Sequence, residues 1–126
     1  LIDVIVSDHM PEDEESKRLP FAQAATGSIG IETLLSLSLE LYHNESLPLE
    51  KIIKCLTINP AKILKINKGT LKEGSDADLC IFDLEKPWVV KAEDLKSKSK
   101  NTAIENRKLQ GKVKMTFLNG EVVYSS

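Results

Sequence analysis

The chain has 126 residues, a length that suits one domain with a buried core. Hydrophobic residues make up 41% and charged residues 29%, an ordinary balance for a globular protein. The formal net charge of -2 gives no electrostatic reason to expect nucleic acid or an anionic membrane as a partner. No apolar run approaches the roughly 20 residues of a membrane span. We therefore expect neither kind of partner.

An apolar run at residues 1–6, rich in β-branched side chains, leads to Asp8-His9 and then to Pro11. Polar and apolar residues alternate only weakly in this run, which predicts a strand buried on both faces, as in a parallel sheet covered by helices. A carboxylate and an imidazole at the end of such a strand lie where barrel enzymes keep their catalytic groups. The alternative is a strand that simply ends in a polar turn.

A polar, mostly acidic run at residues 12–18 and a stretch of small residues at 22–28 predict a loop of about twenty residues, a length usually associated with function or mobility. Gly27 and Gly30 permit either a close approach of the backbone to a ligand or a tight entry into the next helix. Helix entry is favoured for Gly30, and both interpretations stay open for Gly27.

Apolar spacing then predicts a helix over residues 29–43, with His43 in a capping position at its C-terminus. A second helix is expected to begin with Ser46 as N-cap and Pro48 in its first turn. Asn59-Pro60 repeats this arrangement of a cap followed by a proline and predicts a third, short helix through Leu64. The two cysteines, Cys55 and Cys80, lie apart among apolar neighbours, so reduced core cysteines of a cytoplasmic protein are expected. A disulfide between them remains an alternative.

From Gly69 onward, β-propensity and turn residues dominate. Residues 79–83 and 88–90 predict two strands, and residues 92–95 predict a helical turn. A hairpin is expected over residues 112–124, because Asn119-Gly120 supplies the two positive φ angles of a type I′ turn. The expected cross-strand pairs are Phe117 with Val122 and Met115 with Tyr124.

Five segments together resemble the dihydroorotases, members of the metal-dependent amidohydrolase superfamily. They are Ser7–Pro11, Asn59–Leu64, Gly69–Leu79, Ser97–Thr102 and Gly111–Gly120. They occur in the order that the family has them and cover essentially the whole chain. The Gly-x-x-Ala-Asp-Leu segment is shared by many amidohydrolases, whereas Ser-Lys-Asn-Thr points more narrowly to dihydroorotase.

The resemblance implies an α/β fold in two parts. Residues 1–66 would be the C-terminal portion of a TIM-barrel amidohydrolase, with the last barrel strand and the helices that follow it. Residues 67–126 would be the C-terminal strands of a small composite β-sandwich domain. The chain has half the roughly 250 residues of a complete barrel and begins at Leu1, so we expect a fragment without the N-terminal part of the same enzyme. The intact protein is expected to be a homo-oligomer.

The activity implied by the resemblance is zinc-dependent, reversible hydrolysis of dihydroorotate to carbamoyl aspartate in de novo pyrimidine biosynthesis. Asp8 matches the family's catalytic aspartate, which moves a proton between the nucleophile and the leaving nitrogen and is also a candidate metal residue. His9 is adjacent to Asp8, so on an extended chain its side chain points to the opposite face. It is expected to support the site through a hydrogen bond, with a ligand role as the alternative.

Glu12 stands where many dihydroorotases have a second histidine that helps to hold the substrate carboxylate. An inward-facing glutamate would repel that carboxylate, so either another cation compensates or Glu12 faces solvent. Backbone amides near Gly27 could then help to hold the carboxylate. Glu12 and Gly27 are therefore the candidate substrate-binding residues.

A zinc site needs three or more protein ligands, and the chain has two histidines in all. The family's other metal ligands lie on earlier strands, so the isolated fragment is expected to be inactive. One alternative is a non-catalytic, dihydroorotase-like subunit that scaffolds another enzyme of pyrimidine synthesis, such as aspartate transcarbamoylase. Another is a cyclic amidohydrolase of hydantoin, dihydropyrimidine or allantoin, against which the Ser-Lys-Asn-Thr segment argues mildly.

Overall fold

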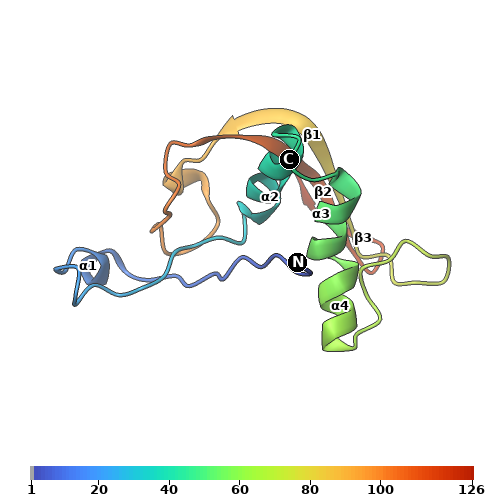
Figure 1. Cartoon of the computed structure of the whole chain (residues 1–126), viewed down its shortest axis with the longest axis horizontal. Coiled ribbons are helices and arrows are strands. Elements are labelled where there is room, and N and C mark those ends of the chain that lie inside the picture. The colour runs from blue at the N-terminus through green and yellow to red at the C-terminus, as the bar shows by residue number, and fades with distance from the viewer. Residues whose placement is uncertain (1) are drawn as a thin grey trace.

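The computed structural model describes residues 2–126, which form four α-helices, one 3₁₀ helix and a three-stranded antiparallel sheet of order β1-β2-β3. Helix α2 (Leu34–His43) packs against strand β2 (Lys108–Leu118) beneath the arch that the sheet makes in Figure 1. The α/β class expected from the sequence is confirmed at this level. The barrel, the sandwich and the division near residue 66 stay predictions. Within residues 2–126 no helix is both long and apolar enough to traverse a bilayer.

The opening segment differs from the prediction, because residues 2–10 contain no strand. Figure 1 shows this segment as an irregular trace that leads away from the helices to α1 (Glu14–Lys17). The pattern of apolar residues suits a strand covered on both faces, but none of the three strands pairs with it. Ile2 and Val6 are each 70% exposed as a result. Hydrogen bonds to the helices hold the first part of the segment instead: Ile5 N donates to Cys55 O at 3.1 Å, and Asn59 Nδ2 donates to Asp3 O at 2.8 Å.

The expected long loop at residues 12–28 contains one helical turn, α1. Asp13 caps this turn, because its side chain accepts a hydrogen bond from Ser16 N at 2.8 Å. The acidic run therefore forms a short helix, and the small residues after it form the irregular part of the loop.

Two helix starts also differ from the prediction. The helix expected from residue 29 begins at Leu34, because the backbone at Gly30 is set by a close approach to Ser7. Pro48, not Ser46, is the N-cap residue of α3 (Leu49–Leu56). Ser46 instead belongs to the end of α2, because its N–H donates a hydrogen bond to Leu41 O at 2.9 Å.

The third helix, α4 (Ile58–Leu64), follows α3 almost directly. Thr57 is both the C-cap residue of α3 and the N-cap residue of α4, with φ -128° and ψ -87°. Pro60 lies in the first turn of α4, where a missing N–H costs little. The proline position agrees with the prediction. Asn59 as the cap is wrong, because Thr57 is the N-cap residue and Asn59 lies inside α4.

The two strands expected at residues 79–83 and 88–90 are one strand, β1 (Leu79–Val89), interrupted by two register shifts against β2. The 3₁₀ helix η1 (Ala92–Asp94) occupies the expected helical turn. Strand β3 (Glu121–Ser125) completes the sheet.

The hairpin of β2 and β3 is confirmed, and so is its turn, since Asn119 and Gly120 have φ angles of 52° and 84°. Phe117 pairs with Val122 as expected. The pairing of Met115 with Tyr124 is wrong: a register shift after Thr116 moves Tyr124 opposite Thr116 and Ser125 opposite Met115. Such an irregularity places an unequal number of residues on the two strands.

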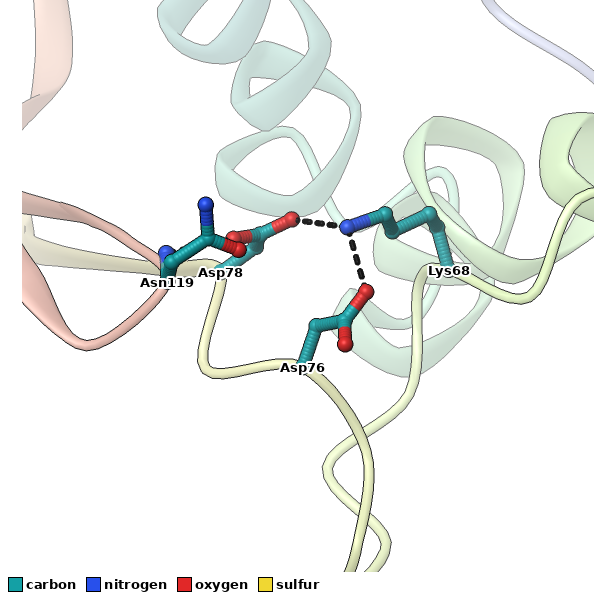
Figure 2. A network of polar contacts seen from close by, with 4 residues as sticks. All are labelled: Lys68, Asp76, Asp78 and Asn119. Carbon is teal, nitrogen blue, oxygen red and sulfur yellow. Dashed lines mark hydrogen bonds and ion pairs between the residues drawn. The ribbon is translucent and has the colours of Figure 1, made fainter.

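An aspartate, Asp78, connects a lysine in the loop before β1 to the hairpin turn. Lys68 Nζ lies 2.6 Å from an oxygen of Asp76 and 2.6 Å from an oxygen of Asp78, and the other oxygen of Asp78 accepts from Asn119 N at 2.9 Å (Figure 2). The turn is therefore held from outside as well as by its own backbone.

One apolar cluster joins the end of the long loop to the sheet. It comprises Ile29, Val90, Leu95 and Leu109, with Leu37, Trp88 and Ile104 packed against it. Both cysteines are free thiols; Cys55 is buried as expected, but Cys80 is exposed and does not belong to the core. The disulfide alternative is therefore not realised.

Candidate functional site

Asp8 has a left-handed backbone, with φ 44°. Few residues other than glycine adopt this region, although Asp and Asn tolerate it best, and non-glycine outliers of this kind cost about 1–3 kcal/mol and cluster at functional sites. Its neighbours are held in place, since His9 Nδ1 accepts from Gly30 N at 3.1 Å and Met10 N donates to Ser28 O at 3.0 Å. The two residues that follow the bend at Asp8 are therefore tied to the segment at residues 28–30.

Asp8 lines a cavity of about 840 Å³ between the opening segment, the end of the long loop and helix α2. Gly27 lines the same cavity, so the structure brings these two candidates together. His9 lines different hollows, next to Ile31 and Leu95. The two side chains were expected to face opposite sides of an extended strand. The chain bends at Asp8 and is not extended there, so this reason does not hold, and the opposite facing stays a prediction.

His9 makes the kind of contact that a supporting residue needs. Its Nδ1 accepts hydrogen bonds from the backbone N–H groups of Gly30 and Ile31, at 3.1 and 3.4 Å. These bonds tie the Asp8 bend to the segment that enters α2. The supporting role itself stays a prediction.

Gly27 is required by space and by backbone conformation. Its φ is 127°, and a Cβ atom there would lie 2.7 Å from the Met10 carbonyl oxygen and 2.8 Å from Met10 Cβ. The same Cβ position is 3.4 Å from Glu12 Cγ. Glu12 does not line the Asp8 cavity and lies against Gly27 instead. Substrate binding by Glu12 and Gly27 stays a prediction.

Two residues that sequence reasoning missed hold this loop. Lys17 Nζ donates to the carbonyl oxygens of Ala25 and Gly27, at 2.7 and 3.0 Å. Asn101 Nδ2 also donates to Gly27 O, at 3.2 Å, and Asn101 Oδ1 accepts from Glu12 N at 3.3 Å. Asn101 lies in the Ser-Lys-Asn-Thr segment, which the sequence singled out only by its resemblance to a family. Nothing in its local pattern indicated that it would reach Glu12.

The other sequence candidate for a polar role, His43, ends α2 as expected. Its Nε2 is buried and has no hydrogen-bond partner within residues 2–126, so the capping contact is not made through that atom. Its ring instead lies edge-on to that of Tyr42, with centroids 5.3 Å apart.

Metal binding was the remaining expectation. Among the side chains of residues 2–126, no group of three or more His, Cys, Asp and Glu could hold a metal ion. Asp8 by itself does not make a zinc site, which takes about four ligands in tetrahedral geometry. The described residues therefore do not fit a complete metal centre.

Comparison with known proteins identifies the family. The model of the amidohydrolase family matches residues 1–123, and the chain therefore belongs to that family. The expected resemblance to amidohydrolases is confirmed. A dihydroorotase of Ehrlichia chaffeensis is 45% identical over 126 residues, which are 100% of this chain and 28% of that protein. The chain thus spans little more than a quarter of the length of this relative.

Solved structures agree on the fold. An L-hydantoinase (dihydropyrimidinase) from Arthrobacter aurescens superposes with a TM-score of 0.76 at 34% identity, over 82% of this chain and 24% of that one. A dihydropyrimidinase from Brevibacillus agri NCHU1002 gives a TM-score of 0.91 at 23% identity, over 98% of this chain and 28% of that one. The fold of most of this chain therefore recurs within longer proteins.

Proposed function

We propose that this chain is the C-terminal part of a cytoplasmic dihydroorotase, and that the longer protein hydrolyses dihydroorotate reversibly to carbamoyl aspartate in pyrimidine biosynthesis. The observation that carries the proposal is that Asp8, an exposed residue with a left-handed backbone, lines a cavity together with Gly27. The 45% identity to a dihydroorotase over the whole chain supports the choice of substrate.

In this reaction Asp8 moves protons. Water attacks the ring amide carbonyl, a carbon–oxygen bond forms and the carbon–nitrogen bond breaks. Asp8 takes a proton from the attacking water and returns one to the leaving nitrogen. Gly27 and its neighbouring amides line the same cavity and would hold the substrate carboxylate. Glu12 would stay outside, against Gly27, where it does not repel that carboxylate.

The metal of this enzyme would be zinc, with most of its ligands outside this chain. We expect the isolated fragment to be inactive, because a zinc site takes about four ligands and most of them would lie outside this chain. A complementary N-terminal piece should restore turnover when it is mixed with this chain. Failure to restore turnover in a formed, zinc-containing complex would contradict the proposal.

A second candidate is another cyclic amidohydrolase, which the 34% identity to an L-hydantoinase favours. The two candidates differ in substrate, so the undivided protein decides between them. We expect its kcat/KM for dihydroorotate to exceed that for hydantoin, dihydrouracil and allantoin by about 100-fold or more, as expected of a site built for the polar groups of one substrate. A preference for one of the other rings would replace the proposed substrate.

Glu12 is the one residue here that favours a non-catalytic scaffold, with aspartate transcarbamoylase as the partner. An inactive dihydroorotase-like domain from Chaetomium thermophilum has a TM-score of 0.58 to this chain at 17% identity, a likeness of fold alone. Loss of the metal ligands expected on the earlier strands, together with no turnover by the undivided protein, would select this candidate.

A further inference from the structure

We propose that Asn101 is a positioning residue: it fastens the two ends of the loop at residues 12–27 to each other and so keeps Gly27 on the wall of the cavity that Asp8 lines. This inference rests on the proposed function for its catalytic meaning. The contacts themselves belong to the fold.

One side chain reaches both ends of the loop. Asn101 Oδ1 accepts from Glu12 N at 3.3 Å, and Asn101 Nδ2 donates to Gly27 O at 3.2 Å. The backbone of Asn101 continues the contact, because its carbonyl accepts from Ile29 N at 3.1 Å and from Ser28 Oγ at 3.2 Å. The loop is therefore closed by a residue that lies more than seventy positions further along the chain.

An amide is suited to this position by its chemistry. Asparagine presents an acceptor and a donor on one rigid plane, and the two loop ends offer an N–H and a carbonyl. Aspartate would keep the acceptor but bring an anionic oxygen to the Gly27 carbonyl. Alanine would offer neither group.

The Gly27 carbonyl is held from two sides. Lys17 Nζ, from within the loop, lies 3.0 Å from this oxygen, and Asn101 Nδ2 lies 3.2 Å from it. Gly27 also cannot take a side chain, since its Cβ would lie 2.7 Å from the Met10 carbonyl oxygen. Two donors thus hold this carbonyl, and the space beside Gly27 excludes any larger residue.

The segment that carries Asn101 is itself anchored to the entry of α2. The Glu32 carboxylate accepts from Lys96 N at 2.8 Å and from Ser97 N at 3.1 Å. Ser99 Oγ donates to the Glu12 carbonyl and also contacts Asn101 Oδ1. We call the two hydrogen bonds of the Asn101 side chain, to Glu12 N and Gly27 O, the clamp. Because residues 96–99 are themselves held in place, Asn101 can set the position of the loop.

The test compares Asn101→Ala and Asn101→Asp with Asn67→Ala in the undivided, zinc-loaded protein. Asn67 is exposed and lies remote in the chain from the loop, so it serves as the matched control. Hydrogen exchange is read on peptides covering residues 10–13 and 26–30 without substrate, and KM and kcat are measured separately. Zinc content and thermal midpoint are recorded for every variant.

In Asn101→Ala, exchange in both peptides should become faster by about tenfold, because two hydrogen bonds are lost. KM for dihydroorotate should rise by about tenfold, with a smaller change in kcat. In Asn101→Asp, protection of residues 10–13 should persist while residues 26–30 exchange faster and KM still rises. A residue with only a stabilising role would reduce the active fraction, which lowers apparent kcat and leaves KM unchanged.

The possible failures are distinguishable. Equal exchange in Asn101→Ala and Asn67→Ala would overturn the clamp, whatever the activity. Faster exchange with an unchanged KM would overturn the positioning role and leave the proposed reaction intact. A wild-type protein that does not turn over dihydroorotate would overturn the proposed function and, with it, the catalytic meaning of the clamp.

Discussion

Trp88 Nε1 donates a hydrogen bond to Ser36 Oγ at 3.1 Å, which links strand β1 to helix α2. Ser36 Oγ in turn donates to the Gly111 carbonyl of strand β2, and Trp88 Nε1 lies 3.2 Å from the same oxygen. Ser36 is 3% exposed, so these groups meet away from water. A single buried hydroxyl thus joins three elements that are distant in the sequence.

Replacing that hydroxyl should weaken the fold. In Ser36→Ala, the Gly111 carbonyl and the Trp88 N–H each lose one partner, and the free energy of unfolding should fall by about 1–2 kcal/mol. Ser38→Ala is the control, because Ser38 is also buried but bonds only within its own helix, to Leu34 O. Denaturant unfolding of the undivided protein measures both variants. Equal losses in the two would mean that the link between helix and sheet contributes nothing of its own.

Asp8→Asn should remove turnover while leaving the backbone bend intact, because asparagine also tolerates a left-handed φ. Loss of the proton-transfer group should lower kcat by about 10²–10⁴-fold. Asp3→Asn, in the same exposed segment, is the matched control and should retain wild-type kcat. Zinc content should be unchanged in both. Wild-type turnover in Asp8→Asn would remove Asp8 from the mechanism.

Two glycines separate the cost of backbone strain from the cost of a clash. Gly120 has φ 84°, and the nearest atom to an added Cβ is 3.9 Å away, so Gly120→Ala should cost about 1 kcal/mol of stability through strain alone. Gly111 has φ 92°, but an added Cβ would also overlap Leu39 Cδ1. Gly111→Ala should therefore cost more than Gly120→Ala.

Thermal or denaturant unfolding measures this difference. Adding Leu39→Ala to Gly111→Ala should cost less than the sum of the single losses, because the clash disappears. Strict additivity would show that Leu39 moves aside without cost.

The ion pairs of Lys68 predict a defined pH dependence of stability. The hydrogen bond to Asp76 and, next in importance, the one to Asp78 hold the pKa of Lys68 above its ordinary value of 10.5. The hydrogen bond from Lys68 and, to a lesser extent, the one from Asn119 N hold the pKa of Asp78 below its ordinary value of 3.8. The stability that the ionised Asp78 adds to the fold is fully present above pH 3.8 and is lost as the pH falls below that value. The stability that the charged Lys68 adds is fully present below pH 10.5 and is lost as the pH rises above that value.

The difference in thermal midpoint between wild type and Lys68→Met should therefore be constant between those limits and shrink outside them. Lys72→Met, from the same exposed loop, is the control and should show no such plateau. Added salt should reduce the plateau, because the pairs are exposed to solvent. A difference that varies steadily across neutral pH would point to another titrating group.

Local signals in the sequence predicted local structure well. The Asn119-Gly120 turn, the three main helices and the proline of α4 follow from backbone preferences that act within a few residues. The pairing of Phe117 with Val122 follows from the turn itself. The pairing further from the turn could not be predicted in the same way, because the register shift after Thr116 depends on contacts of β2 with both neighbouring strands.

The candidate site was predictable only in part. Asp8 and Gly27 were identified as candidates, and the structure places them on one cavity. The opening segment was expected to be a strand because its composition suits one, but strand formation needs a neighbour to pair with. Lys17 and Asn101 were missed because their partners are carbonyl and N–H groups, which every residue has and no sequence pattern marks.

The loop closure by Asn101 has a consequence for how the protein is made. During translation Glu12 and Gly27 are synthesised well before Asn101, because Asn101 lies 89 positions after Glu12 and 74 positions after Gly27. During that interval the nascent loop has Lys17 but not its distal partner. Order at the cavity wall is therefore acquired late in translation, and a premature stop even a few codons before residue 101 would release a chain whose loop is never fastened.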